Sequence, residues 1–454
     1  MERYDAIIIG FGKGGKTLAG KLAGMGSKVA LVEKSDKMYG GTCINVGCIP
    51  SKSLVRSAEV SYGHPGMDFK QKSALYKKAI QEKRRVTSML RGKNYDKLNI
   101  LPNVAVIHGT ASFHSNTVLD IETDNGKLQL EGEKIYINTG STPVIPRIPG
   151  LEDNPFVYIS ETLMELEVLP ERLVIIGGGY IGLEFASMYS GFGSKVTVLQ
   201  DGEQLIPRED RDIAFAVQEI LENRGVEFKL GAAVHRVVSG TDKASVEITY
   251  GGETLSLEAE AVLVATGRRP NTDGLNAAAA GVELTHRGAV VVDDYLRTTA
   301  PNIWAMGDVA GGLQFTYVSL DDSRIIWSQI HGQGYSLSGR KNVPYSVFLA
   351  TPYSRVGLNE EEAVEHGYSI RVLKLPVQAI PKAQVLKKTE GLLKAVIDQD
   401  TGKILGAMLL CEESYEMINI VKLAMDMDAD YRALANQIFT HPTMSEALND
   451  LFAV

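Results

Sequence analysis

The sequence predicts an α/β protein with two copies of one strand–glycine turn–helix–strand unit, followed by a C-terminal α+β region. The first copy begins with Ala-Ile-Ile-Ile at residues 6–9, a short apolar run typical of a central parallel strand, and a glycine-rich turn follows at residues 10–15. Residues 173–182 repeat this run and turn 167 residues later. From about Lys341 on, strand and helix patterns occur without a further turn of this kind.

In the first unit, the glycine turn leads into a helix of small residues and then into a second strand that ends in Glu33. This is a Rossmann-like pattern, which binds a dinucleotide for physical reasons. Gly10, Gly12 and Gly15 permit a tight turn and close approach to a pyrophosphate, helix N–H groups face the phosphates, and the acid receives the ribose hydroxyls. A glycine fingerprint alone is weak evidence, but here the strand, the helix and Glu33 all stand in place.

The second unit carries its own fingerprint at Gly177, Gly179 and Gly182. The Gly-Ser-Lys-Val of residues 26–29 also recurs at residues 193–196, again 167 residues later, so chance explains the register poorly. Two such units predict two bound dinucleotides. Two glycine turns in an ordinary α/β sheet remain the alternative.

The position in the second unit that matches Glu33 is Gln200. Glutamine can bond a ribose hydroxyl, but it lacks the carboxylate that repels a 2′-phosphate. No arginine pair follows to receive that phosphate, since the first arginine after Gln200 is Arg208. The sequence favours NADH over NADPH, with NADPH still open.

Cys43 and Cys48 are two of only three cysteines and have four residues between them. On a straight helix this step separates the side chains by about 7.5 Å along the axis, which makes a bridge awkward. Gly47 can bend the backbone, and Pro50 suits the first turn of a helix that starts near Cys48, where the helix dipole favours a thiolate. The pair is interpreted as a catalytic dithiol/disulfide. Half a metal site or two buried apolar side chains are the alternatives.

The composition excludes several classes of partner. A net charge of −8 and a pI near 5.6 argue against a nucleic acid or an anionic membrane, since both reward clustered basic residues. The Lys/Arg-rich stretch at residues 69–99, including Lys83, is interpreted as the solvated face of a surface helix, with the border of a substrate entrance as the alternative. With neither a leader-like start nor a long apolar run, the chain is expected to be soluble and cytoplasmic.

Taken together, these features resemble the flavin-dependent pyridine nucleotide-disulphide oxidoreductases, which include dihydrolipoamide dehydrogenase, glutathione reductase and mercuric reductase. The resemblance runs from Tyr4 to Phe452. Besides the two fingerprints, it is carried by Gly-Gly-Thr-Cys-x4-Cys at residues 40–48, Ala-Thr-Gly-Arg-Arg-Pro-Asn at 265–271, Gly-Asp-Val at 307–309 and His-Pro-Thr-Met-Ser-Glu at 441–446. Residues 38–43, 311–317 and 437–442 are most similar to the reactive chlorine resistance flavoproteins and the hypothiocyanous acid reductases.

The resemblance implies four segments: an FAD-binding domain with the redox disulfide at 1–150, an NAD(P)H-binding domain at 151–272, a second FAD-binding or central part at 273–340 and a dimerisation domain at 341–454. FAD would occupy the first unit, with Asp308 reaching the ribityl chain, and NAD(P)H the second. The implied cofactor-binding residues are Gly10, Gly12, Gly15, Glu33, Gly41, Thr42, Thr139, Gly140, Gly177, Gly179, Gly182, Gln200, Gly267 and Asp308.

The resemblance also gives each redox residue a role. Cys48 matches the thiol that faces the flavin, and Cys43 the thiol that exchanges with substrate. Lys52 and Glu184 match a pair beside the flavin ring; apart from the resemblance they would be ordinary helix-surface charges.

His441 and Glu446 match a base and the carboxylate that orients it. In the family this pair serves the partner subunit's cysteines, so a homodimer with a shared active site is implied. A histidine suits the task because it can take the proton of Cys43 near neutral pH or protonate a leaving group.

Electrons would then pass from NAD(P)H through FAD and the Cys43–Cys48 disulfide to a small oxidised substrate. Reactive chlorine species or hypothiocyanous acid fit a single reactive thiol, and Cu(II) is a further candidate because thiolates bind and reduce it. Dihydrolipoamide dehydrogenase is the main rival, although Phe439 stands where its signature has a second histidine. A non-catalytic redox sensor would need neither His441 nor Glu446. No resident metal site is predicted, and Cys411 is expected in the core.

Overall fold

The computed structural model describes residues 1–453. The chain forms two compact units. The first comprises Met1–Ser53, Ala79–Val144 and Gly267–Arg340, and the second comprises Leu54–Lys78, Ile145–Thr266 and the chain from Lys341 on. This division is coarser than the four segments expected from the sequence, whose boundaries stay a prediction.

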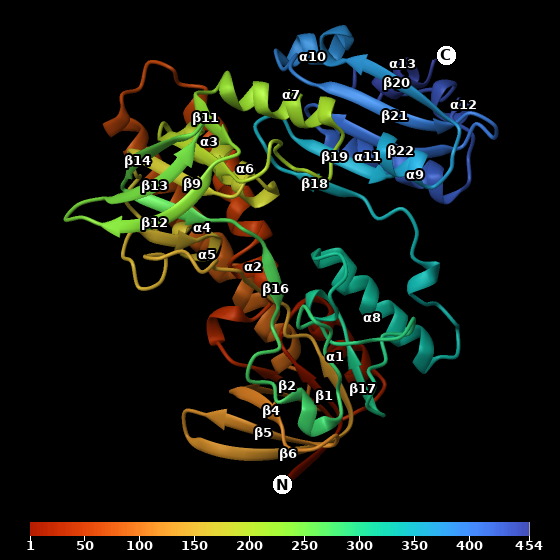
Figure 1. Cartoon of the computed structure of the whole chain (residues 1–454). Coiled ribbons are helices and arrows are strands. Elements are labelled where there is room, and N and C mark those ends of the chain that lie inside the picture. The colour runs from red at the N-terminus through yellow and green to blue at the C-terminus, as the bar shows by residue number, and fades with distance from the viewer. Residues whose placement is uncertain (454) are drawn as a thin grey trace. The chain divides into compact units, whose positions relative to one another are not determined.

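The first unit is organised around one seven-stranded sheet in the order β3-β2-β1-β6-β5-β4, with β17 also pairing with β6 (Figure 1). Strands β1, β2, β3, β6 and β17 pair in parallel, and β5 pairs antiparallel with both β4 and β6. The strands are β1 (Glu2–Ile9), β2 (Val29–Glu33), β3 (Val104–His108), β4 (Thr110–Phe113), β5 (Val118–Thr123), β6 (Gly126–Ile137) and β17 (Ile303–Ala305). A small antiparallel pair, β7 (Ser141–Pro143) and β16 (Arg268–Pro270), completes the unit.

The apolar run of β1 is buried on both faces of this sheet. Ile7 belongs to a core cluster on one face, while Ile8 packs with Leu18 of α1 (Lys13–Gly24) and Ile325 of α8 (Thr316–Ile330) on the other. Successive strand residues point to opposite faces, so an unbroken apolar run fits a central strand covered on both sides.

The second unit contains three sheets. The first is parallel, in the order β11-β10-β9-β15-β8, the second is antiparallel, in the order β12-β13-β14, and the third has the order β18-β19-β22-β21-β20. Their strands are β8 (Val157–Ile159), β9 (Arg172–Ile176), β10 (Lys195–Gln200), β11 (Val226–Leu230), β12 (Ala233–Ser239), β13 (Ala244–Tyr250), β14 (Glu253–Ala259), β15 (Ala261–Val264), β18 (Tyr345–Val347), β19 (Tyr353–Gly357), β20 (Ile370–Pro376), β21 (Leu392–Asp398) and β22 (Ile404–Leu410). The third sheet is the C-terminal α+β region that the sequence predicts, drawn in blue in Figure 1.

The remaining helices connect these sheets and cover them. The α-helices are α2 (Thr42–Asn45), α3 (Cys48–Tyr62), α4 (Phe69–Asn99), α5 (Ser160–Leu163), α6 (Tyr180–Phe192), α7 (Arg211–Glu222), α9 (Glu360–Glu365), α10 (Pro381–Leu386), α11 (Ser414–Asp426), α12 (Arg432–Ala435) and α13 (Ala447–Phe452). The 3-10 helices are η1 (Asp36–Met38), η2 (Ala277–Ala280), η3 (Asp308–Ala310), η4 (Leu337–Gly339) and η5 (Val377–Ala379). The mixed α/β class is confirmed.

One part of the sequence interpretation is wrong. Helix α4 forms over the predicted residues, but Lys83 is not on a solvated face, because it is only 1% exposed. Ile80, Lys83 and Thr87 are spaced three and four residues apart, and all three are buried. They therefore form one buried stripe of the helix. The many basic residues of this segment made that stripe hard to recognise in the sequence.

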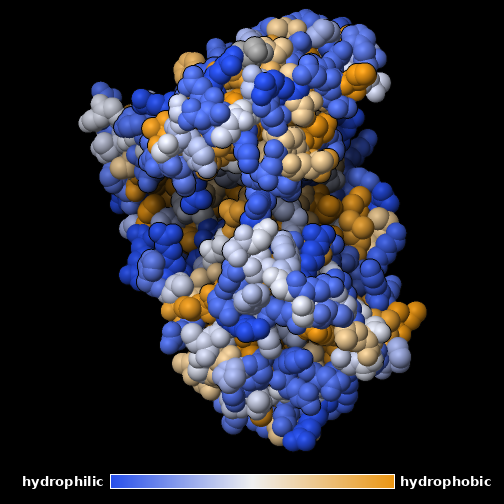
Figure 2. Space-filling view, turned by 90° about the vertical axis from the view of Figure 1, so that its right-hand side faces the viewer, coloured by the Kyte–Doolittle hydropathy of each residue, from blue (hydrophilic) through white to orange (hydrophobic). Residues whose placement is uncertain are grey.

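The described surface is mainly hydrophilic on the face shown in Figure 2, where hydrophobic residues lie in separate groups among hydrophilic ones. Within residues 1–453, no helix has both the length and the apolar character needed to cross a lipid bilayer.

Candidate active site

The first glycine turn is closed by tight backbone contacts. Gly10 has a φ of +104°, and a Cβ atom there would lie 2.3 Å from the Asn138 carbonyl oxygen. A Cβ at Gly12 would lie 2.5 Å from Asn138 Oδ1, and one at Gly15 would lie 2.6 Å from the Gly10 carbonyl oxygen. Only glycine fits these three positions without a shift of the turn.

Asn138, which follows β6, fastens this turn to two other segments. Its Oδ1 accepts a hydrogen bond from Gly15 N at 2.9 Å, and its Nδ2 donates to the Met306 carbonyl at 2.7 Å and to Ser319 Oγ at 3.3 Å. Ser319 Oγ also accepts from Gly14 N at 3.2 Å. Asn138 and Ser319 could not be identified from the sequence, because neither residue type nor spacing marks a side chain whose partners lie more than a hundred residues away.

Glu33 ends β2 beside the same turn. Its carboxylate accepts hydrogen bonds from Phe11 N at 3.0 Å and Ser35 N at 3.2 Å. Burial raises the pKa of Glu33 above its usual 4.5, and the two N–H donors partly oppose the rise because they favour the charged form.

The second glycine turn repeats the geometry of the first. Gly177 has a φ of +112°, and a Cβ there would lie 2.6 Å from the Ala265 carbonyl oxygen. A Cβ at Gly182 would lie 2.0 Å from the Gly177 carbonyl oxygen. Gln200 Oε1 accepts from Gly178 N at 2.8 Å, which is the contact that Glu33 makes with Phe11 in the first unit.

Other glycines leave open space beside these closed turns. At Gly140, Gly179 and Gly267, no atom of the described residues other than those of the glycine and its two chain neighbours lies within 4 Å of where a Cβ would stand. Open backbone at the carboxyl ends of parallel strands, next to a helix N-terminus, is where a dinucleotide pyrophosphate binds. The residues present therefore fit a nucleotide in each unit.

Asp308, at the start of η3, is held in position within the first unit. Ser141 Oγ donates to Asp308 Oδ2 at 2.7 Å, and Arg268 Nε donates to Ser141 Oγ at 2.9 Å. Thr139 lies nearby in sequence and donates from Oγ1 to the Asn271 carbonyl at 2.6 Å. The structure thus joins the predicted positions Thr139 and Asp308 to the segment that carries Arg268 and Asn271.

The cysteine segment packs directly on the first glycine turn. Gly41 has a φ of +79°, and a Cβ there would lie 2.8 Å from Gly12 Cα. Helix α2 begins at Thr42, and α3 begins at Cys48, as the sequence predicts. Gly47 forms the bend between them without a left-handed φ, and a Cβ there would lie only 3.0 Å from the Thr42 carbonyl oxygen.

No disulfide joins Cys43 and Cys48; Cys43 is half-buried and Cys48 is exposed. A hydrogen bond to the Cys48 thiol and burial raise the pKa of Cys43, whereas Thr316 and Lys16 act to lower it. Cys48 Sγ lies 3.7 Å from Thr316 Oγ1. Thr316 is the first residue of α8 and was not identified from the sequence.

Lys52 and Glu184 belong to different units, so their pairing stays a prediction. Lys52 lies on α3 four residues after Cys48. Glu184 lies on α6 and is only 9% exposed, so it is not an ordinary surface charge. Its Oε1 accepts a hydrogen bond from Phe348 N at 2.8 Å.

His441 and Glu446 form the pair that the sequence predicts. His441 Nδ1 lies 2.8 Å from Glu446 Oε2, and Glu446 immediately precedes α13. With Nδ1 facing the carboxylate, Nε2 of the exposed histidine is the ring nitrogen left for another partner.

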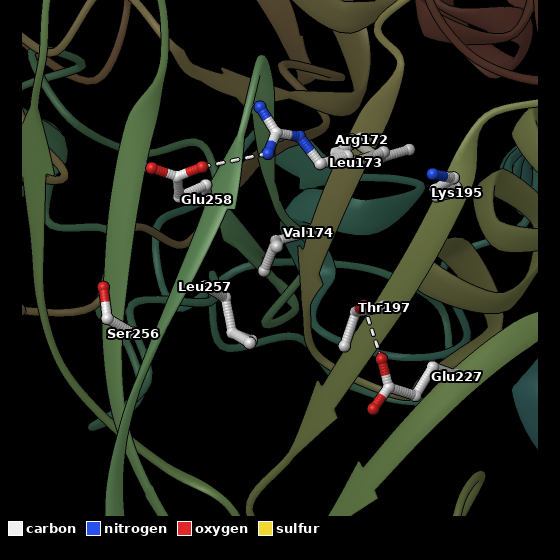
Figure 3. A pocket seen from close by; sticks show the side chains of 9 residues that line it. All are labelled: Arg172, Leu173, Val174, Lys195, Thr197, Glu227, Ser256, Leu257 and Glu258. Carbon is white, nitrogen blue, oxygen red and sulfur yellow. Dashed lines mark hydrogen bonds and ion pairs between the residues drawn. The ribbon is translucent and has the colours of Figure 1, made fainter.

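A pocket of about 330 Å³ in the second unit lies away from the predicted nucleotide site (Figure 3). Its lining includes Arg172, at the start of β9, and Lys195, at the start of β10, so it opens at the amino ends of these strands. Arg172 pairs with Glu258, and Thr197 donates to Glu227. Nucleotides bind at the carboxyl ends of parallel strands, so this pocket is not the predicted site.

One carboxylate cluster in the described residues has the geometry of a cation site. It comprises Asp210, Asp212 and Glu360, and the Lys394 ammonium group lies among them, 2.7 Å from Asp210 and 2.9 Å from Asp212. The cluster thus already pairs with a cation of the chain itself. Cys411 is fully buried and contacts the Met417 sulfur at 3.7 Å, which confirms the prediction that it belongs to the core.

Comparison with known proteins identifies the family. Residues 4–323 match the pyridine nucleotide-disulphide oxidoreductase family, and residues 343–452 match the dimerisation domain of the same family. A probable pyridine nucleotide-disulfide oxidoreductase from Escherichia coli, RclA, is 51% identical over 455 residues, which covers 100% of both chains.

More distant relatives match almost the full length as well. A mercuric reductase from Lysinibacillus sphaericus is 34% identical over 98% of this chain and 82% of its own. A dihydrolipoyl dehydrogenase from Bacillus subtilis is 34% identical over 98% of this chain and 97% of its own.

Among solved structures, the Cu(II) complex of the HOCl-induced flavoprotein disulfide reductase RclA from E. coli superimposes with a TM-score of 0.94, covering 100% of this chain and 99% of that chain at 51% identity. The fold agrees with these matches. The chain therefore belongs to the pyridine nucleotide-disulphide oxidoreductases and is a flavoprotein disulfide reductase whose cofactors are FAD and NAD(P)H.

Proposed function

We propose that this reductase passes electrons from NAD(P)H to a reactive chlorine species or to hypothiocyanous acid. The single observation that carries the proposal is the full-length 51% identity with RclA, whose solved structures are described as an HOCl-induced flavoprotein disulfide reductase. The mercuric reductase and the dihydrolipoyl dehydrogenase are much less similar, at 34%.

We assign FAD to the first unit and NAD(P)H to the second. Gly10, Gly12, Gly15 and Glu33 would hold the FAD phosphates and ribose, with Asp308 near the ribityl chain; Gly177, Gly179, Gly182 and Gln200 would hold the nicotinamide dinucleotide. FAD held there would supply the hydride-accepting and disulfide-reducing chemistry. Lys52 and Glu184 would lie beside its ring. The protein's own contribution is the placement of these groups.

The chain's own chemistry takes place at Cys43 and Cys48. Two-electron reduction of their disulfide yields a Cys43 thiolate, which attacks the oxidised chlorine or sulfur atom and releases hydroxide. Cys48 then attacks the Cys43 sulfur, reforms the disulfide and releases chloride or thiocyanate. The start of α3 at Cys48 favours the thiolate needed for that second step, because the helix dipole stabilises negative charge.

We assign His441 and Glu446 to a site completed by a second copy of the chain. The family's dimerisation domain covers residues 343–452, and His441 within it is 66% exposed. Ile438, three residues earlier, is 92% exposed, and Leu423 and Met427 are exposed at 61% and 73%. Apolar side chains at such exposure suit a subunit interface. His441 of the partner subunit would then act as the base for Cys43.

Cu(II) is a second candidate acceptor, because a solved RclA structure is described as a Cu(II) complex. A dihydrolipoamide dehydrogenase or a mercuric reductase is less supported. Phe439 occupies the position where the signature of dihydrolipoamide dehydrogenase has a second histidine. A non-catalytic redox sensor would not need the His441–Glu446 pair. The NADH preference and the cytoplasmic location expected from the sequence stay predictions.

The test is steady-state oxidation of NADH and NADPH against hypochlorous acid products, hypothiocyanous acid, Cu(II), lipoamide, glutathione disulfide and Hg(II). We expect the fastest turnover with the chlorine or thiocyanate oxidant, and its loss in Cys43→Ser and Cys48→Ser. Cys411→Ser is the matched control and should retain turnover, since Cys411 is buried in the core. A dominant lipoamide rate, or full turnover in either catalytic-cysteine variant, would overturn the proposal.

A further inference from the structure

Lys16 brings an ammonium group to the cysteine segment. It lies in the first turn of α1, directly after the glycine turn, and is partly buried. Its Nζ donates to Asn94 Oδ1 at 2.5 Å and to the Gly40 carbonyl at 3.4 Å. Both acceptors are neutral, and no carboxylate of the described residues forms an ion pair with it. The charge of Lys16 is therefore held in place without being cancelled.

The position of Gly40 brings this charge close to Cys43. Gly40 begins the Gly-Gly-Thr-Cys segment, and Gly41 packs against Gly12 at the start of the same helix α1. The ammonium group of Lys16 interacts electrostatically with Cys43 and acts to lower the pKa of that thiol. In return, Cys43 acts to raise the pKa of Lys16.

The other charges around this pair do not replace Lys16. Burial lowers the pKa of Lys16 to about 8, and Lys13 and Lys97 act in the same direction. Lys16 therefore remains mainly protonated near neutral pH. Around Cys43, the Cys48 thiol opposes ionisation and Thr316 favours it. Arg91, on α4, donates instead to the Lys37 carbonyl and to Asn45.

We propose that Lys16 is a positioning residue for the redox reaction, whose ammonium group, fixed by Gly40 and Asn94, stabilises the Cys43 thiolate formed when the disulfide is reduced. This inference rests on the proposed role of Cys43 as the thiol that attacks the oxidant. A thiolate in a partly buried site lacks part of its hydration, so a nearby cation changes its population and its nucleophilicity together. Lys16 thereby sets how much of Cys43 is ready to react at neutral pH.

The experiment measures the thiol itself rather than turnover. In flavin-loaded Cys48→Ser protein, Cys43 is the one thiol outside the core, because Cys411 is buried. The rate of its alkylation by iodoacetamide is followed across pH in this background and after adding Lys16→Met. We expect the midpoint of the profile to rise by about one pH unit. The rate near neutral pH should fall about threefold, since the smaller thiolate fraction is partly offset by greater intrinsic nucleophilicity.

Two matched variants separate charge from packing. Lys16→Arg keeps the cation and should keep the midpoint. Lys21→Met removes a charge from the last turn of the same helix, where Lys21 lies over the Trp327 ring, and should also leave the midpoint unchanged. If Lys16→Met folds poorly, Lys16→Gln gives the same comparison with a polar side chain.

An unchanged midpoint in Lys16→Met and Lys16→Gln would overturn the inference. An equal shift in Lys16→Arg would also overturn it, because the effect would then come from packing. Alkylation needs neither NAD(P)H nor an electron acceptor. A failure of the proposed function would appear as turnover in the cysteine variants, whereas a failure of this inference would appear only in the alkylation profile.

Discussion

The two glycine turns of this chain have the same backbone design but different surroundings. Gly10 and Gly177 adopt φ angles of +104° and +112°, and each turn receives a side-chain oxygen from the end of the next strand, from Glu33 and from Gln200. The residue that closes each turn from the neighbouring strand differs: it is Asn138 in the first unit and Ala265 in the second.

That difference decides how firmly each turn is held. Asn138 links the first turn to Met306 and Ser319 through buried hydrogen bonds, whereas alanine has no polar side chain with which to make such links. A fastened turn suits a cofactor that stays bound, and a turn without these links suits a nucleotide that enters and leaves at each cycle. The comparison therefore supports FAD in the first unit and NAD(P)H in the second.

The largest expected effect comes from replacing a glycine by alanine in one glycine turn at a time. Gly15→Ala places a Cβ 2.6 Å from the Gly10 carbonyl oxygen and should give protein without flavin absorbance. Gly182→Ala places a Cβ 2.0 Å from the Gly177 carbonyl oxygen and should give yellow protein that dithionite bleaches but NADH does not. Gly24→Ala is the control, since nothing lies within 4 Å of its Cβ position. The reverse pattern of colour would break the assignment of the two cofactors.

Removing the Asn138 side chain should have the next largest effect. Asn138→Ala leaves the buried Gly15 N–H and Met306 carbonyl without their partner, at about 1–3 kcal/mol for each group. We expect a loss of about 2–5 kcal/mol in the free energy of unfolding, measured by denaturant titration of flavin-loaded protein. The exposed Asn125→Ala should change it by no more than about 0.5 kcal/mol. Equal losses in both variants would show that Asn138 has no special role in the first turn.

Replacing Gln200, which accepts a hydrogen bond from Gly178 N at the second turn, should alter the preference between NADH and NADPH. Gln200→Glu adds a carboxylate where a 2′-phosphate would lie, so kcat/KM for NADH relative to NADPH should rise about tenfold. Gln218→Glu, on the exposed side of α7, adds the same charge away from the turn and should leave the ratio unchanged. If the ratio does not move in Gln200→Glu, Gln200 does not contact the ribose.

The smallest expected effect concerns the pH dependence of stability in the first turn. Because the pKa of Glu33 is raised above 4.5 in the folded protein, the folded state holds its proton to a higher pH than the unfolded chain. Its contribution to stability is therefore full below about pH 4.5 and is lost as the pH rises through the folded pKa. The difference in unfolding free energy between wild type and Glu33→Gln should fall across this window. Gln200→Ala, which removes a group that does not titrate, should give a flat difference from wild type.

Much of the fold could be predicted because it follows from patterns of residues that are close together in the sequence. The apolar run before Gly10, the glycine spacing and the repeat at 167 residues indicated two parallel-sheet units, and the start of α3 followed from Pro50. Lys83 was misplaced, because a helix of 31 residues needs a buried stripe and residue type does not show which positions form it. The bend expected at Gly47 is present between α2 and α3, and a Cβ there would also crowd the Thr42 carbonyl oxygen.

By itself, the sequence indicated the residues proposed to carry the chemistry: the cysteine pair, the two fingerprints and the His441–Glu446 pair, through residue types at fixed spacing together with the family resemblance. Only the tertiary structure decided which side chains support them. Asn138, Ser319, Thr316 and Lys16 act through contacts with segments remote in the chain. Folding brings these partners together by packing, and no pattern of residues close together in the sequence shows which side chains will meet.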